Sequence, residues 1–92
     1  PVDGKVRKFA VMKDPVSGRT MTVSTTLPAC QVYTANFIEG QIGKNGHIHH
    51  VHDAVCLETE AYPDAPNKES FPSCIVRPEK PYHETTVYKF GF

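Results

Sequence analysis

The sequence predicts an all-β protein with the architecture of an antiparallel β-sandwich. Residues 19–25 and 84–92 alternate between apolar and polar side chains, which is the period of two typical of a half-buried strand. No stretch repeats apolar residues with the 3.6-residue period of an amphipathic helix, and eight prolines among 92 residues leave little room for one. Turn-forming residues separate the strand-like stretches. Strands of this kind bury their apolar faces by stacking as two layers.

The first two strands are expected over residues 6–12 and 19–25. Between them, residues 13–18 read Lys-Asp-Pro-Val-Ser-Gly, in which the proline and the glycine favour a turn. In the second stretch Met21 and Val23 point to one face, and the intervening threonine and serine residues point to the other. We therefore expect the two strands to pair as an antiparallel hairpin.

Three further stretches are strand candidates: residues 30–37, 48–59 and 84–92. Asn45 and Gly46, which lie between the first two of these, have the composition of a tight turn with positive φ. Two prolines within residues 63–67 end the preceding strand, because proline supplies no backbone donor. Residues 71–77 are expected to be extended but irregular. Without a partner layer these strands would leave edges and one face uncovered, which fits a piece of a larger sandwich.

Composition and charge exclude several classes of function. Ten basic residues balance ten acidic ones, so no net charge would attract nucleic acid or an acidic membrane surface. No apolar run approaches the roughly 20 residues that a membrane-spanning helix requires, and the N-terminal residues do not form a signal peptide. Three cysteines without CxxC spacing are interpreted as free thiols in a reducing compartment. We therefore expect a cytoplasmic protein of at most one domain, with no nucleic-acid or membrane partner.

A pair of carboxylates is the first candidate for chemistry. In the fourth expected strand Glu58 and Glu60 share one face, and Leu57 and Thr59 share the other. Two carboxylates at this spacing repel each other when both lose solvent, and burial raises the pKa of a carboxyl group, which suits a general base near neutral pH. The alternative is that both side chains face solvent at a strand end, and the spacing alone favours that alternative.

A histidine-rich segment, His-Ile-His-His-Val-His over residues 47–52, is the second candidate. On a strand, His47 and His49 would share one face, where an HxH pair can supply two zinc ligands. The possible further ligands are Asp53 and His83. Four histidines divided between two faces cannot all bind one ion, and no CxxC or HExxH motif accompanies them. The sequence therefore favours an exposed strand without a native metal site, although the segment could bind zinc or nickel in vitro.

Five motifs together resemble the C-terminal part of the aldose 1-epimerase (galactose mutarotase) family. They are TLPACQVYTANF (26–37), GKNG (43–46), CLETEAYPDAPN (56–67), FPSCIVRP (71–78) and TTVYKF (85–90). Their order and spacing are similar to those of the family, and the resemblance covers nearly the whole chain. It implies that residues 1–92 are the C-terminal segment of a single β-sandwich domain whose upstream part is absent. The fold expected from the resemblance is the C-terminal part of the galactose mutarotase-like supersandwich.

The resemblance also implies a reaction. The family interconverts the α and β anomers of aldohexoses such as galactose and glucose by acid/base ring opening, with no cofactor or metal. The Glu of the LET segment, here Glu58, corresponds to the general base that takes the proton from the anomeric hydroxyl. Gln31 corresponds to a residue that hydrogen-bonds the sugar, and a neutral amide can both donate to and accept from hydroxyl groups. The implied partners are a small-molecule aldohexose and the remainder of the enzyme's own chain.

The chain departs from the family pattern at several positions. Glu60 stands where the family usually has Gln, and Ala35 stands where it has Gly. The family's acid histidine, its second active-site histidine and its sugar-binding Asp and Arg lie upstream, and none of the five histidines here corresponds to them. This chain alone therefore has a base without an acid and is expected to be inactive. The alternative function is a non-catalytic sugar-binding or interaction β module derived from the same fold. A small metal-binding β protein built on residues 47–52 is a third possibility.

Overall fold

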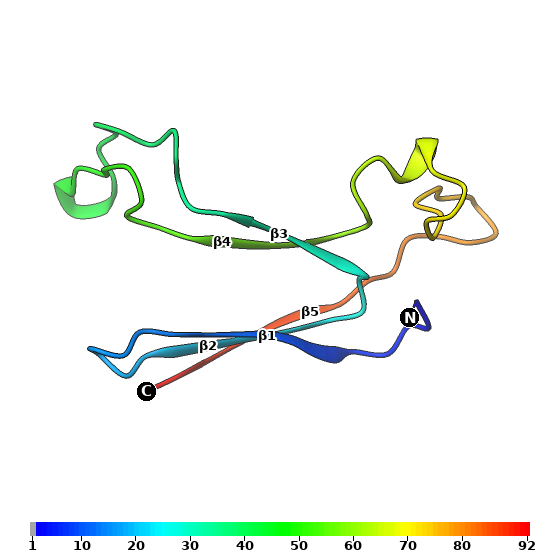
Figure 1. Cartoon of the computed structure of the whole chain (residues 1–92), viewed down its shortest axis with the longest axis horizontal. Helices are drawn as coiled ribbons and strands as arrows, with labels where there is room; N and C mark the ends of the chain where they lie inside the picture. Colours follow the sequence, from blue (N-terminus) through cyan, green and yellow to red (C-terminus); the bar gives the residue numbers. More distant parts are fainter. Residues whose placement is uncertain (1) are drawn as a thin grey trace.

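Five strands form two antiparallel sheets in the computed structural model of the chain, which describes residues 2–92 (Figure 1). The strands are β1 (Arg7–Lys13), β2 (Thr20–Thr25), β3 (Ala29–Tyr33), β4 (Cys56–Glu60) and β5 (Thr86–Gly91). One sheet has the order β1-β2-β5, and the other is the pair β3-β4. The helical elements of the described residues are two short 3-10 turns, η1 (Lys44–Gly46) and η2 (Ala65–Asn67). The predicted all-β, antiparallel fold is confirmed.

The predicted hairpin of the first two strands is confirmed, because β1 pairs with β2 in an antiparallel register. Its turn closes through two backbone hydrogen bonds: Asp14 N donates to Arg19 O (3.0 Å), and Gly18 N donates to Asp14 O (2.9 Å). Gly18 has φ 76°, a conformation that glycine adopts without steric cost. The backbone geometry of the turn thus favours glycine at position 18, the residue that predicted the turn from the sequence.

Strand β2 is central, since it pairs with β1 on one side and with β5 on the other. Val23, which was predicted to share one face with Met21, is fully buried, and Thr25 is nearly so. On β5 the partner of Val23 is Tyr88. The predicted half-buried strand is therefore confirmed, and the structure adds that it is the middle strand of its sheet.

The third and fourth strands are shorter than predicted. Strand β3 ends at Tyr33, and Ala35 has a left-handed backbone with φ 58°, which breaks the strand. The predicted strand over residues 48–59 is wrong before Cys56, because His52 also has positive φ (67°) and turns the chain. The predicted turn at Asn45 and Gly46 is confirmed, with φ 59° and 76°.

Hydroxyl groups join the two sheets. Thr86 Oγ1 of β5 lies 2.7 Å from Thr59 Oγ1 of β4 and 3.0 Å from Thr25 Oγ1 of β2. In addition, Tyr88 Oη donates to Leu57 O (3.0 Å). These contacts place β3 and β4 over the three-stranded sheet as a second layer (Figure 1).

The chain buries little of its apolar surface. Its accessible surface is 7316 Å², compared with about 5,300 Å² for a compact folded protein of this mass. Its radius of gyration is 16.6 Å, compared with about 12 Å for a compact domain of this length. The buried apolar residues within positions 2–92 are Val23, Ala35 and Ala65. Large apolar side chains on both sheets consequently remain open to solvent. Among the same residues, no helix is long and apolar enough to cross a membrane.

Candidate functional site

The register of β3 and β4 places Gln31 directly opposite Glu58. Residues opposite each other in an antiparallel pair project to the same face, with Cβ atoms about 4.5–5.5 Å apart. Thr59, the next residue, hydrogen-bonds Thr86 of the other sheet, so by alternation Glu58 projects away from that sheet. Both Gln31 and Glu58 are exposed. An amide and a carboxylate therefore lie side by side on the outer face of the strand pair.

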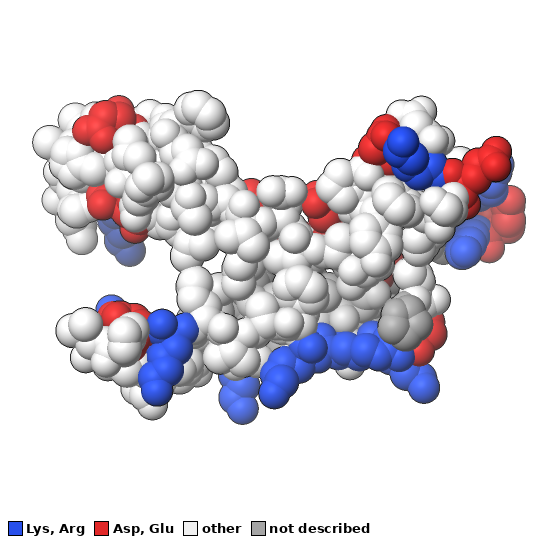
Figure 2. All heavy atoms as spheres, viewed as in Figure 1, with Lys and Arg blue, Asp and Glu red and all other residues white. Residues whose placement is uncertain are grey.

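Glu60 projects to the same face as Glu58, two residues further along β4, and is half-buried. The space-filling view is hollowed above the middle of β3 and β4, between a raised end that carries η1 and another that carries η2 (Figure 2). The Lys and Arg side chains gather mainly on the opposite side of the molecule, below the three-stranded sheet (Figure 2). The outer face of β4 is therefore acidic.

Cys30 does not have the surroundings of a nucleophilic thiol. All three cysteines are free thiols, as predicted. Cys30 pairs with Thr59 and so faces the three-stranded sheet rather than the hollow. Partial burial raises the pKa of the Cys30 thiol, with a backbone hydrogen bond to Glu58 acting in the opposite direction and the charges of Glu60 and Glu58 adding to the rise. A thiol with a raised pKa is mostly protonated near neutral pH and is a poor nucleophile.

The histidines of residues 47–52 divide between different contacts. His50 Nδ1 lies 2.8 Å from Glu39 Oε1, and that hydrogen bond raises the pKa of His50 and lowers the pKa of Glu39. His52 Nε2 lies 2.9 Å from Asn36 Oδ1. The remaining two, His47 and His49, lie close to Asp53, which the sequence had offered as a further ligand. His83, the other candidate ligand, lies elsewhere and lines a cavity.

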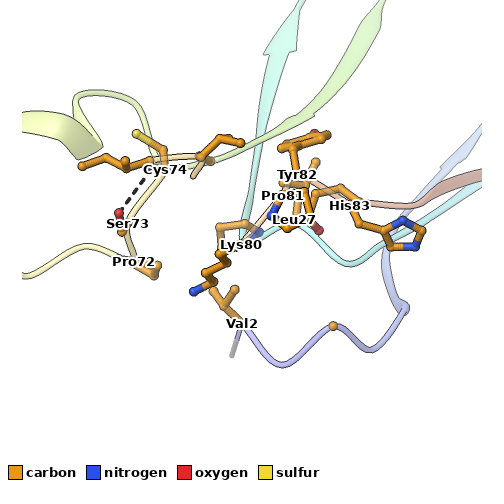
Figure 3. Close-up of a pocket in the computed structure, with 15 residues that line it drawn as sticks. Val2, Leu27, Pro72, Ser73, Cys74, Lys80, Pro81, Tyr82 and His83 are labelled. Carbon is orange, nitrogen blue, oxygen red and sulfur yellow. Dashed lines mark hydrogen bonds between the residues drawn. The ribbon is translucent and has the colours of Figure 1, made fainter. Parts of the chain in front are cut away.

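A cavity of about 340 Å³ is lined by the residues just before β3, by residues 72–76 and by the segment that leads into β5 (Figure 3). Its lining includes Leu27 and Pro28, residues 72–76 and residues 80–84. Its only lining residue from the end of β4 is Ala61, and neither Gln31 nor Glu58 reaches it. The cavity carried no signal in the sequence, because the segments that line it lie far apart along the chain.

The outer face of β3 and β4 has the chemistry of a site for a hydroxylated ligand. An amide can hold hydroxyl groups by hydrogen bonds, and a neighbouring carboxylate can accept a proton from one of them. The chain belongs to the aldose 1-epimerase family, since a model of that family matches residues 2–89.

Individual relatives agree with this assignment. Galactose mutarotase from Mus musculus is 42% identical over 91 residues, which cover 97% of this chain and 27% of the mouse protein. Galactose mutarotase from Homo sapiens is 47% identical over 76 residues, which cover 82% of this chain and 22% of the human protein. Aldose 1-epimerase from Escherichia coli (strain K12) is 35% identical over 72 residues, which cover 76% of this chain and 21% of the E. coli protein. The chain thus spans about a quarter of the length of the relatives it matches.

Proposed function

We propose that the protein acts as an aldose 1-epimerase, interconverting the α and β anomers of aldohexoses such as galactose and glucose. The observation that carries the proposal is the position of Glu58 opposite Gln31 on the outer face of β3 and β4. Membership of the family supports it, and so do relatives named galactose mutarotase and aldose 1-epimerase. In this proposal residues 1–92 are the C-terminal segment of one β-sandwich domain.

Glu58 is the general base in the proposed reaction. Its carboxylate takes the proton from the hydroxyl on C1, and the electron pair of that O–H bond forms the carbonyl. The bond between C1 and the ring oxygen breaks, and an acid protonates that oxygen. After rotation about C1–C2, the steps reverse on the other face of the carbonyl and give the other anomer. No atom is gained or lost, so the chemistry needs one base and one acid and no redox partner.

Gln31 acts as a sugar ligand in this scheme. Its amide can donate to one hydroxyl oxygen and accept from another, which fixes the ring relative to the carboxylate opposite. The acid is proposed to come from the remainder of the protein, which would also cover the exposed face and exclude water from the hollow. Removing water strengthens each hydrogen bond to the sugar and the electrostatic interactions of each charged group in the site.

The test is Glu58→Gln in the full-length protein, assayed by polarimetry for mutarotation of α-D-galactose and α-D-glucose. Loss of a general base typically lowers turnover by about 10²–10⁴-fold. Circular dichroism and thermal unfolding should show little change, because the exposed side chain makes no contact that the fold requires.

The matched control is Glu60→Gln, which removes a carboxylate from the same strand face and should retain most activity. Retained turnover in Glu58→Gln would refute the assignment of the base. A wild-type protein that binds galactose without accelerating mutarotation would instead favour the non-catalytic sugar-binding module.

A further inference from the structure

Residues 40–49 form a small hairpin at the end of the molecule that carries η1 (Figure 1). Gly40 N donates to His49 O (2.8 Å), His49 N donates to Gln41 O (2.9 Å), and Gly43 N donates to His47 O (2.7 Å). These bonds hold the backbone of His47 and His49 in an extended arm, so alternate side chains on it project to one side.

A second turn brings a carboxylate to the same place. Asp53 N donates to His50 O (3.1 Å), and His50 N donates to Asp53 Oδ2 (2.9 Å), so the carboxylate is tied to the backbone of its own turn. His47 Nε2 lies 3.8 Å from Asp53 Oδ2. The rings of His47 and His49 meet edge to face with centroids 5.2 Å apart. One potential ligand atom from each of these three residues lies within 4.8 Å of the other two.

We propose that His47, His49 and Asp53 form a binding site for a divalent transition-metal ion of the Zn²⁺ class. Two imidazoles and one carboxylate are ligands that Zn²⁺ accepts, at about 2.0–2.2 Å from each donor atom. Donor atoms around a tetrahedral ion then lie roughly 3.3 Å apart, so the side chains must close by about 1–1.5 Å. His47 and Asp53 are partly exposed and can make this adjustment by rotation about their side-chain bonds.

The other two histidines of residues 47–52 make hydrogen bonds of their own, which leaves three protein ligands for the proposed site. One ring nitrogen of His50 contacts Glu39 and one ring nitrogen of His52 contacts Asn36, so a ring nitrogen of each is engaged by a residue outside the cluster. The sequence-based objection that four histidines on two faces cannot bind one ion therefore does not apply to this arrangement. The partly exposed cluster leaves the remaining coordination positions to water.

Gly43 offers a way to perturb the site without removing a ligand. A Cβ atom at position 43 would lie 2.0 Å from Nε2 of His49, so the imidazole occupies the space that the glycine leaves free. Gly43 itself has φ −97°, which alanine adopts without strain. Gly43→Ala therefore displaces the His49 ring and leaves all three ligand residues in the chain.

The experiment is a Zn²⁺ titration of the full-length protein, purified without a histidine tag, in competition with a chromophoric chelator. The wild type should bind one equivalent of Zn²⁺. The His49→Ala and Asp53→Asn variants should not bind this equivalent. Gly43→Ala should lower the affinity for this Zn²⁺ ion by at least about tenfold, as changes that misorient a metal ligand do. Mg²⁺ at the same concentration should not compete, because it prefers oxygen ligands.

The matched control is His83→Ala, which removes an exposed histidine outside the cluster and should leave the titration unchanged. The proposal would be overturned if His49→Ala and Asp53→Asn bound Zn²⁺ with the same stoichiometry and affinity as the wild type. Loss of the Zn²⁺ equivalent in His52→Ala but not in His49→Ala would overturn the ligand set. Far-ultraviolet circular dichroism of each variant separates loss of ligands from loss of the fold. The proposal does not depend on the mutarotase function.

Discussion

Gln31 and Glu58 lie directly opposite each other across β3 and β4, on the face that points away from the three-stranded sheet. The two residues are far apart in the sequence, and only the register of the strand pair brings them together. A slip of one residue would send one of the two side chains to the inner face. The strand register is therefore the structural feature on which the proposed site depends.

Gln31→Ala should raise KM for galactose by up to about tenfold in the full-length protein and change kcat less. The reason is that a hydrogen bond between uncharged groups contributes about 0.5–1.5 kcal/mol, present in both the bound sugar and the transition state. Initial mutarotation rates across a range of sugar concentrations measure the two constants. Gln41→Ala, an exposed amide in the η1 hairpin, is the control. A lower kcat at unchanged KM would contradict a role for Gln31 in binding.

Thr86→Val should destabilise the full-length protein by about 1–3 kcal/mol. Valine keeps the shape of threonine but leaves the hydroxyls of Thr25 and Thr59 without their shared partner in a part-buried position. Chemical denaturation measures the difference in unfolding free energy. Thr85→Val changes an exposed threonine one residue earlier and should cost much less. Equal stability of the two variants would show that the hydroxyls do not hold the sheets together.

The Asp14 carboxylate should make the β1–β2 turn sensitive to acid. Hydrogen bonds from the Ser17 hydroxyl (2.7 Å) and from the backbone of Val16 and Ser17 hold the pKa of Asp14 below its usual range. A carboxyl with a lowered folded pKa contributes stability above its unfolded pKa of about 4, and the contribution disappears as the pH falls through the folded value.

Asp14→Asn should therefore be less stable than the wild type near pH 6, and the two proteins should converge below the folded pKa of Asp14. Denaturation midpoints measured from pH 6 to pH 2 test this. A difference that persists unchanged at pH 2 would mean that the carboxylate charge is not the cause.

Much of the fold could be predicted because the informative patterns are local. The alternation around Val23, the Pro-Gly turn ending at Gly18 and the Asn45-Gly46 turn each depend on neighbouring residues alone, and each is confirmed. The predicted length of the fourth strand is wrong, because a left-handed residue at His52 interrupts a stretch whose composition suits a strand. A single positive φ at a histidine leaves no pattern in the sequence.

The candidate sites also include features that the sequence predicted and features that only the structure revealed. Glu58 and Gln31 were selected by family resemblance, and their facing positions became visible only with the strand register. The cluster of His47, His49 and Asp53 depends on a hairpin followed by a turn, whereas a continuous strand was expected there. Side chains brought together by irregular backbone cannot be assigned to a common face by counting residues.

Ala35→Val should destabilise the full-length protein by at least about 2 kcal/mol. Ala35 is 1% exposed and has φ 58°, and a β-branched side chain in this conformation is strained and has no space. The same position ties the end of β3 to the loop, since Ala35 O accepts hydrogen bonds from Ile38 N (3.4 Å) and His52 N (3.3 Å). Ala35→Gly is the control: it relieves the backbone strain but loses a buried methyl group worth about 0.8 kcal/mol, so its net effect should stay within about 1 kcal/mol of zero. Urea denaturation of both variants measures the difference. If valine were tolerated as well as glycine, residue 35 would not adopt the left-handed conformation, and the end of β3 would have to be placed further along the chain.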